Sequence, residues 1–533
     1  MRPPTFGLFL FAFVGCGSPK PDPSAAVDAG VPAPDASPDG APDGAPSLPP
    51  APAMSWAKCT AFGDTAECAT VSVPLDWSKP DGKKIDLFVA RTLAKPQPAR
   101  AVLFYLAGGP GGSARYWGQA HDYPGVDVYA IDHRGTGESR RLSCPKEEAN
   151  DSPEGLRLAL EEVAPCAAYL RKNWGDDLKH IGTSDSARDV YALAEWVRSP
   201  GQRLFLYGSS YGSYLANRYM TLFPDHADAV AIDAILTAGN YNSYRTNKFW
   251  FDPTAHKLMD ACAADSFCSS KLGPDPYAAW QEAVKKVDDG GCPVLKSVGV
   301  DGATMRLGFE LLTVYSNIYT RNLVPALIHR VRRCGDGDIN ALFRLVKSQA
   351  GAVAAADDPM KKNWVLNLHV HVTELPDDAP FDPSWLDASG PLSSTLPALL
   401  KAAKDANWPA YHEPLASTWG THSKPILITH GEHDFLPFDL AKASADHWRG
   451  PNQTFLSFPR VSHGTLATPW TGASILNPWC GNMLLKGFFS NPSGTLDTTC
   501  VGKMPEFDFS GASVSGLSTA MFGTSDPWEG VAP

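Results

Sequence analysis

Apolar residues in this chain gather in short runs separated by glycine, proline and polar clusters. Runs of this length without alternation are typical of strands buried on both faces, as in a parallel sheet. They occur at residues 101–106, 126–131, 204–207, 229–235, 425–431 and 454–458. Residues 69–73 and 84–94 are also typical of strands, and the turn Lys79-Pro80-Asp81-Gly82 separates them.

Helical spacing replaces this pattern in two places. The apolar residues of 184–197 predict a helix that leads into the run at 204–207. From about residue 239 to 409 the strand pattern stops, and helical stretches such as 304–316 and 324–331 take over. The whole pattern predicts an α/β fold, with a mostly parallel sheet flanked by helices and an inserted helical cap.

The expected domain organisation follows these changes of pattern. The chain divides into a leader at 1–16, a disordered tether at 17–54, a first part of the α/β core at 55–238, a cap at 239–409, a second part of the core at 410–502 and a C-terminal tail at 503–533. The tether is rich in Pro, Ala, Asp and Gly, and such a composition cannot bury enough apolar surface to fold. The Gly/Ser-rich tail carries no pattern that assigns it a structure.

The leader has the features of an export signal. Arg2 precedes an apolar stretch at 6–14 that is too short to span a bilayer as a mature helix. It ends Phe13-Val14-Gly15-Cys16-Gly17-Ser18, which resembles a bacterial lipobox, with Cys16 as the lipidated first residue of the mature protein. Cleavage without a lipid is the alternative. We therefore expect an exported protein, anchored to the bacterial cell envelope (periplasmic or surface) or secreted.

The cysteines point to the same compartment. The chain has eleven, and those after Cys16 fall into sequence-adjacent couples without a Cys-x-x-Cys motif of zinc or thioredoxin chemistry. An even number behind an export signal favours disulfides, with reduced buried cysteines as the alternative. Spacing alone leaves the connectivity open, and the expected pairs are Cys59–Cys68, Cys144–Cys166, Cys262–Cys268, Cys292–Cys334 and Cys480–Cys500.

The run at 204–207 leads into Gly208-Ser209-Ser210-Tyr211-Gly212, after which the apolar residues take helical spacing. Gly-x-Ser-x-Gly between a strand and a helix indicates a nucleophile elbow, a turn so tight that its flanking positions need residues without bulk. The hydroxyl of Ser210 would stand exposed above the sheet. The N–H of Tyr211, at the start of the helix, would point to where an oxyanion forms.

A second oxyanion donor is expected from another glycine-rich segment. The run at 101–106 ends in Ala107-Gly108-Gly109-Pro110-Gly111-Gly112-Ser113, a loop whose backbone can approach a ligand closely. In an architecture with a nucleophile elbow, the loop at this place supplies the second donor, and we expect it to be the N–H of Gly109. A purely structural turn is the competing interpretation.

Ser210 needs a base to take its proton, and the base needs a carboxylate to fix its tautomer. In this architecture the acid follows the strand after the cap, and the histidine follows the last strand. Gly431-Glu432-His433-Asp434 and Val461-Ser462-His463-Gly464 occupy these two places. We therefore expect Asp434 as the acid and His463 as the base.

Two other residues compete for these roles. Glu432 lies closer to the strand end than Asp434, where a solvated turn residue is expected. His133 follows the run at 126–131 in Asp132-His133-Arg134-Gly135-Thr136-Gly137. A histidine followed by Arg-Gly-Thr-Gly at a strand end indicates a structural turn, so we expect neither residue to be catalytic.

Together these motifs resemble the α/β-hydrolase branch of proline iminopeptidases and secreted tripeptidyl-aminopeptidase-like proteins. The resemblance covers about residues 56 to 502 and rests on the glycine-rich loop, the Asp132–Gly137 motif, the elbow, the acid and histidine motifs and the late cysteine couple. It implies the release of short pieces from peptide amino termini. Such exopeptidases need a carboxylate in the cap for the substrate's α-ammonium group. Glu310 and Glu374 are the candidates, with a surface or structural role as the alternative for each.

The sequence thus predicts a serine hydrolase that transfers an acyl group to water without a metal or an organic cofactor. The expected partner is a peptide or a small ester. The net charge of −11 argues against a nucleic acid, and a membrane is expected to be reached only through lipidated Cys16. A carboxylesterase of small acyl esters is the alternative activity, and an anchored, non-catalytic binding protein on a hydrolase scaffold is the alternative of another class.

Overall fold

The computed structural model describes most of the chain after the tether. The described residues are 48–59, 66–113, 123–236, 238–239, 243–356, 362–375, 381–448, 450–471 and 479–531. The leader with Cys16 and most of the tether predicted for 17–54 lie outside them. Among the described residues, no helix has the length and apolar character that a bilayer crossing needs.

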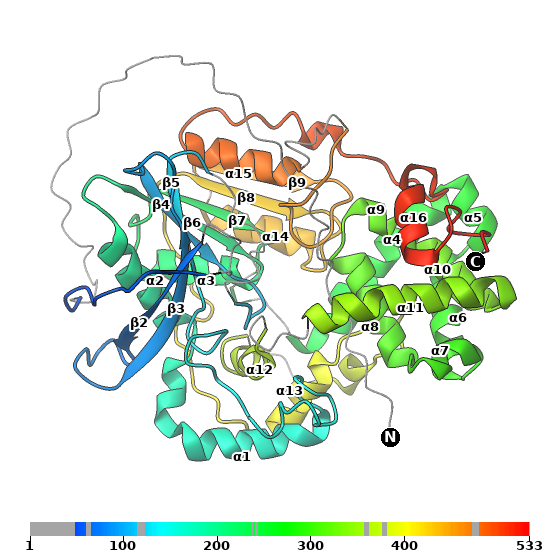
Figure 1. Cartoon of the computed structure of the whole chain (residues 1–533), viewed down its shortest axis with the longest axis horizontal. Coiled ribbons are helices and arrows are strands. Elements are labelled where there is room, and N and C mark those ends of the chain that lie inside the picture. Colours follow the sequence, from blue (N-terminus) through cyan, green and yellow to red (C-terminus); the bar gives the residue numbers. More distant parts are fainter. Residues whose placement is uncertain are drawn as a thin grey trace.

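One sheet of nine strands organises the described part of the chain, in the order β1-β2-β3-β5-β4-β6-β7-β8-β9 (Figure 1). The strands are β1 (Ala57–Lys58), β2 (Glu67–Pro74), β3 (Lys84–Thr92), β4 (Ala101–Leu106), β5 (Val126–Ile131), β6 (Arg203–Ser209), β7 (Ala229–Asp233), β8 (Ile426–Gly431) and β9 (Gln453–Phe458). Pairing is antiparallel from β1 to β3 and between β3 and β5. From β5 to β9 all neighbours are parallel. This is the mostly parallel sheet that the apolar runs predict.

Helices cover both faces of the sheet, which explains why its central strands are apolar throughout. Val102, Phe104 and Leu106 of β4 pack into one core together with α1 (Val163–Asn173), α2 (Thr183–Val197), α3 (Tyr211–Leu222) and α14 (Phe438–Ala445). Leu103 and Tyr105, which alternate with them, pack on the other face against α15 (Cys480–Ser490). Both kinds of position are therefore buried.

A group of helices, here called the helical insert, lies between β7 and β8 (Figure 1, green to yellow). It consists of α4 (Asp252–Ala264), α5 (Ser266–Leu272), α6 (Pro276–Asp288), α7 (Pro293–Ser297), α8 (Gly302–Val314), α9 (Ile318–Arg321), α10 (Val324–Arg333), α11 (Asp336–Ala356), α12 (Trp364–Thr373) and α13 (Leu396–Asp405). All of these helices fall within residues 239–409. Because the insert leaves the sheet at the carboxyl end of β7, it lies next to the loops that carry the expected site residues.

The C-terminal tail, for which the sequence predicts no structure, packs onto the insert. Its helix α16 (Ser515–Phe522) lies against α11 (Figure 1, red). Trp528 is buried, and the guanidinium of Arg330 donates to the carbonyls of Asp526, Pro527 and Gly530. The tail thus ties the end of the chain to the insert.

Five disulfides are present in the described residues, and each joins the two cysteines of one sequence-adjacent couple. They are Cys59–Cys68, Cys144–Cys166, Cys262–Cys268, Cys292–Cys334 and Cys480–Cys500. Two of them lie in the insert. Their arrangement matches the pairs expected from the sequence and excludes the alternative of reduced buried cysteines at these positions.

Candidate active site

Ser210 stands in the tight turn between β6 and α3. Its backbone angles are φ 57° and ψ −124°, a conformation that costs free energy and persists only where the surroundings impose it. The flanking glycines are needed for close approach. A Cβ on Gly208 would lie 2.2 Å from the carbonyl oxygen of Gly212, and a Cβ on Gly212 would lie 1.9 Å from that of Leu106. The segment therefore has the tight turn of a nucleophile elbow, as the sequence motif predicts.

The glycine-rich loop after β4 lies directly against the serine. A Cβ on Gly108 would be 3.0 Å from the Cβ of Ser210 and 3.5 Å from its Oγ. Gly109 follows with φ 127°, a region that favours glycine. Tyr211, on the other side, is the first residue of α3, so its N–H is among those at a helix start without a partner inside the helix. Gly109 therefore follows a residue that borders the serine hydroxyl, and Tyr211 follows the serine itself.

Asp434 and His463 face each other across the ends of two neighbouring strands. The Nδ1 of His463, after β9, is 2.9 Å and 3.0 Å from the two carboxylate oxygens of Asp434, after β8. Asp434 is buried, and its Oδ1 also accepts the N–H of Leu436. Burial alone would raise the pKa of Asp434, but the neighbouring His463 and His430 and these hydrogen bonds hold it below its usual range. The carboxylate therefore fixes the Nδ1–H tautomer and leaves Nε2 as the acceptor.

Aromatic rings surround this histidine. The ring of Phe435 lies 4.7 Å from that of His463, and Tyr315 of the insert meets it edge-on at 5.6 Å. Such rings restrict the access of water and limit the orientations of the imidazole.

The two rival residues lie in structural positions. Glu432 is half-buried, its N–H donates to the carbonyl of Phe458, and its own carbonyl accepts from Lys257. The carbonyl of His133 accepts both the N–H and the hydroxyl of Thr136, as expected for a turn. Burial lowers the pKa of the His133 imidazole to about 4.

Main-chain carbonyls at the end of α8 hold the histidine loop. The N–H of His463 donates to the carbonyl of Val314 at 3.0 Å, and the hydroxyl of Ser462 donates to the carbonyl of Ser316 at 2.6 Å. The insert therefore fixes the backbone of the base as well as covering the sheet edge. Sequence reasoning had no means of finding these contacts, because a main-chain carbonyl has no side-chain signal.

The start of α12 holds the glycine-rich loop in the same way. Asn363 donates its N–H to the carbonyl of Gly111 at 2.8 Å, and Asn367 donates its side-chain amide to the carbonyl of Pro110 at 3.0 Å. A Cβ on Gly111 would lie 2.2 Å from the carbonyl oxygen of Asn363, so only glycine fits there. The sequence analysis missed both asparagines. The one available signal was that Asn363 precedes an apolar helical run, as a helix cap does.

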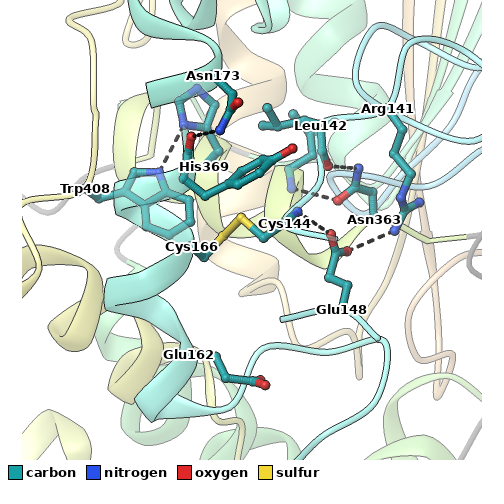
Figure 2. Close-up of a disulfide and its surroundings, with 12 residues drawn as sticks. Arg141, Leu142, Cys144, Glu148, Glu162, Cys166, Asn173, Asn363, His369 and Trp408 are labelled. Carbon is teal, nitrogen blue, oxygen red and sulfur yellow. Dashed lines mark hydrogen bonds and ion pairs between the residues drawn. A yellow bond between two sulfur atoms is a disulfide. The ribbon is translucent and has the colours of Figure 1, made fainter. Parts of the chain in front are cut away.

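The side chain of Asn363 connects the helix to a third segment (Figure 2). Its amide group donates to the carbonyls of Gly135 and Leu142, while its Oδ1 caps α12 by accepting the N–H of Leu366. This contact lies beside the disulfide Cys144–Cys166. One buried residue therefore links the insert, the glycine-rich loop and the segment after β5.

The structure gives different surroundings to the two carboxylates that the sequence analysis expects to bind substrate. Glu374 is already engaged, because its Oε1 accepts from the N–H of Thr183 and the hydroxyl of Tyr411, and its Oε2 lies 3.7 Å from Arg218. Glu310, in α8, is buried and has no hydrogen bond or ion pair with any described residue. Burial raises its pKa to about 7, partly offset by the charges of Lys362 and Arg157.

Glu310 is also well placed along the chain. It lies one helical turn before Val314, which holds the histidine loop. Lys362, whose charge acts on Glu310, pairs through its backbone with Gly112 of the glycine-rich loop. Glu310 is therefore connected to the histidine loop through its own helix and to the glycine-rich loop through Lys362.

Similarity to known proteins agrees with this geometry. The chain matches the alpha/beta hydrolase fold family over residues 101–252. It is 29% identical over 505 residues to a tripeptidyl aminopeptidase of Streptomyces lividans, with 84% of this chain and 86% of that protein covered. It is 26% identical over 256 residues to the serine protease Hip1 of Mycobacterium tuberculosis, with 42% and 48% covered. Among solved structures, a proline iminopeptidase of Mycobacterium smegmatis is 15% identical, with 74% of this chain and 91% of that chain covered and a TM-score of 0.32.

The expectation of the sequence analysis is therefore confirmed at the level of fold and reaction class. A parallel sheet with a serine elbow between β6 and α3, the family match over the same strands and the relatives named as peptidases all agree. The chain has the α/β-hydrolase fold and the reaction class of a serine hydrolase, and it is similar over most of its length to a tripeptidyl aminopeptidase.

Proposed function

We propose that this hydrolase is an exported aminopeptidase that releases short peptides or residues from the amino termini of its substrates through an acyl-enzyme on Ser210. The observation that carries the proposal is the hydrogen bond between the buried Asp434 and Nδ1 of His463, which leaves Nε2 of the imidazole as a proton acceptor. Two relatives are named as an aminopeptidase and a serine protease. Their names support peptide bonds as the substrate.

The reaction follows from these groups. His463 Nε2 accepts the Ser210 proton as Oγ attacks the carbonyl carbon, and the N–H groups of Tyr211 and Gly109 stabilise the oxyanion. The imidazolium, stabilised by Asp434, then gives its proton to the leaving amine as the C–N bond breaks. Water attacks the acyl-serine with His463 as base, and the acid product and free Ser210 are released.

Proton transfer from Ser210 requires the hydroxyl to meet the imidazole. In the described part of the chain, Ser210 Oγ has no hydrogen bond to His463. Catalytic hydrogen bonds in enzymes without substrate are often long and tighten only when the substrate is bound. We therefore place the formation of this contact in the substrate complex.

Glu310 supplies the group that an aminopeptidase needs. An α-ammonium group bound by a buried carboxylate gains a strong charge-assisted hydrogen bond, and Glu310 has no competing ion pair within the described residues. Glu374 would first have to release Thr183 and Tyr411. We therefore assign the ammonium site to Glu310 and a structural role to Glu374.

The five disulfides support the location of the protein in an oxidising compartment. We propose that the protein is exported and that Cys16, which lies outside the described residues, carries a lipid anchor. Mass analysis of the mature amino terminus from the native host tests this: a diacylated Cys16 supports the anchor, and an unmodified terminus rejects it.

A matched panel of substrates tests the activity. It contains tripeptidyl and aminoacyl amides with a free amino terminus, their N-acetylated forms and short acyl esters. We expect the free-amine amides to be cleaved with the highest kcat/KM. Turnover of esters alone would reject the peptidase and favour the carboxylesterase, and no turnover of any substrate together with no labelling by a fluorophosphonate would favour a non-catalytic binding protein.

A further inference from the structure

Asp233, which no motif singles out, ends β7 between the serine elbow and the histidine loop. Its main-chain carbonyl accepts the N–H of Ser210 at 2.9 Å. In the sheet, Asp233 is paired with Ser209, the last residue of β6. The backbone of Asp233 is therefore fixed to the nucleophile.

The side chain of Asp233 is fixed to the base. Both carboxylate oxygens lie 3.0 Å from the N–H of Thr465, which is two residues after His463. The hydroxyl of Tyr207 donates to Oδ2 at 3.0 Å, and that of Thr429 donates to Oδ1 at 3.1 Å. The side chain is buried, so these bonds are not exchanged for bonds to water.

We propose that Asp233 is a positioning residue that sets the distance between the Ser210 hydroxyl and the His463 imidazole and adds a second negative charge beside the imidazolium. The proposal rests on the proposed catalytic roles of Ser210 and His463. Asp233 forms hydrogen bonds to both the elbow and the histidine loop. Asp434 contacts the imidazole and has no hydrogen bond to the elbow among the described residues.

The charged groups around His463 define the electrostatic part of this role. Asp434 contacts the ring directly, while Asp233 and His430 interact with it through their charges. Lys257 of the insert lies near Asp434. Burial raises the pKa of Asp233 above its usual range, and the hydrogen bonds from Thr465 and Tyr207 and the charge of His463 offset only part of this effect. Because each of these hydrogen bonds is donated to the carboxylate, they favour its ionised form.

Burial lowers the pKa of His430, which keeps that ring neutral near pH 7. The carboxylates beside the imidazolium are those of Asp434 and Asp233, and removal of the negative charge of either one makes the imidazolium less stable.

The variant Asp233→Asn tests the proposal, with rates normalised by active-site titration with a fluorophosphonate. We expect kcat per titrated site to fall by about 10- to 100-fold, the effect of a displacement of about 1 Å, while KM changes little. The acid limb of the kcat/KM profile should move to lower pH, because the imidazolium loses a neighbouring negative charge. If Asp233 contributed to stability alone, neither kcat per titrated site nor the acid limb of the pH profile would change.

Asp127→Asn is the matched control. Asp127 is also a buried carboxylate with main-chain and side-chain donors, the N–H of Ala94 and the amide of Gln97, but it lies in β5 and contacts no residue of the site. It should lower thermal stability and leave kcat per titrated site and the pH profile unchanged.

Tyr207→Phe keeps the charge of Asp233, removes one donor and keeps the proposal testable if Asp233→Asn does not fold. We expect a smaller decrease in kcat in the same direction. Unchanged kcat and an unchanged acid limb in whichever of the two variants folds would overturn the proposal. If the wild-type protein is not labelled at Ser210 at all, the proposed function has failed instead, so the two failures are distinguishable.

Discussion

In the sheet, each side chain that we propose to react follows a strand end: Ser210 comes directly after β6, Asp434 three residues after β8 and His463 five residues after β9. In the helical insert, the contribution to the same site comes from main-chain carbonyls and amides, with Val314 holding the histidine loop and Asn363 holding the glycine-rich loop. The comparison shows that one region carries the proposed reacting groups and that the other region positions them. In the proposed mechanism, the sheet supplies the groups that react, and the insert holds the loops that carry them and supplies the ammonium site.

Loss of the acid is expected to have the largest effect. In Asp434→Asn, the amide cannot fix the Nδ1–H tautomer or stabilise the imidazolium, so kcat should fall by about 10⁴-fold. The measurement is kcat for the best amide substrate. Glu432→Gln, two residues earlier, is the control and should retain wild-type kcat; a large loss in Glu432→Gln with little loss in Asp434→Asn would exchange the two assignments.

The second-largest effect is expected from a variant that tests whether the insert aligns the proposed catalytic groups. Asn363→Ala removes the amide bonds to Gly135 and Leu142 and the cap of α12. We expect kcat/KM per titrated site to fall by about 10- to 100-fold through misplacement of the glycine-rich loop. Asn173→Ala is the control, because Asn173 is exposed on α1 and bonds only to its own helix in the described structure. A lower melting temperature with unchanged kcat/KM would reduce the role of the insert to stability.

The third-largest effect is expected from a variant that tests whether Glu310 of the insert binds the substrate. Glu310→Gln should raise KM for substrates with a free amino terminus by about 30-fold or more, because the ammonium group loses its partner. The KM for the N-acetylated forms of these substrates should be unchanged. Glu282→Gln, in the exposed part of α6, is the control. An equal loss for free and N-acetylated substrates would contradict an ammonium site.

A pH dependence accompanies this site. Burial raises the pKa of Glu310 to about 7, and only the ionised carboxylate pairs with the ammonium group. As the pH falls through about 7, kcat/KM should therefore decrease several-fold more for free-amine substrates than for N-acetylated ones. The two profiles should become parallel in Glu310→Gln. Parallel profiles in the wild-type enzyme would remove Glu310 from substrate binding.

The smallest effect on activity is expected from the disulfides of the insert. Cys292–Cys334 spans 42 residues and Cys262–Cys268 spans 6. Replacing both cysteines of the longer loop by alanine should lower the free energy of unfolding by about 2–4 kcal/mol, and replacing those of the shorter loop should lower it less. Thermal unfolding and kcat/KM at 25 °C measure the two quantities. A large loss of activity at unchanged stability would show that these bonds align the site.

The sequence predicts the sheet well and indicates the groups that we propose to react, in both cases for local reasons. The strands at 426–431 and 453–458 are apolar runs, and their loops follow in a fixed chain order, which identifies Asp434 and His463 without knowledge of the strand order. The glycines around Ser210 are required by contacts within a few residues, apart from the contact with Leu106.

The contribution of the insert and the contacts of Asp233 could not be predicted, because both depend on contacts between distant segments. Asn363 bonds to Leu142 across 221 positions, and Thr465 bonds to Asp233 across 232 positions. A single asparagine or aspartate carries no pattern that names its partner. The tail is a similar case, since the burial of Trp528 depends on Arg330 and its neighbours in the insert.

Mapping of the fluorophosphonate adduct by mass spectrometry tests the central claim most directly. The account predicts one adduct, on Ser210, which forms in the wild-type protein and is lost in Ser210→Ala. In His463→Ala the adduct should form at least about 10³-fold more slowly, because no base activates the serine. An adduct on another residue, or labelling of Ser210 at the wild-type rate without His463, would contradict the account.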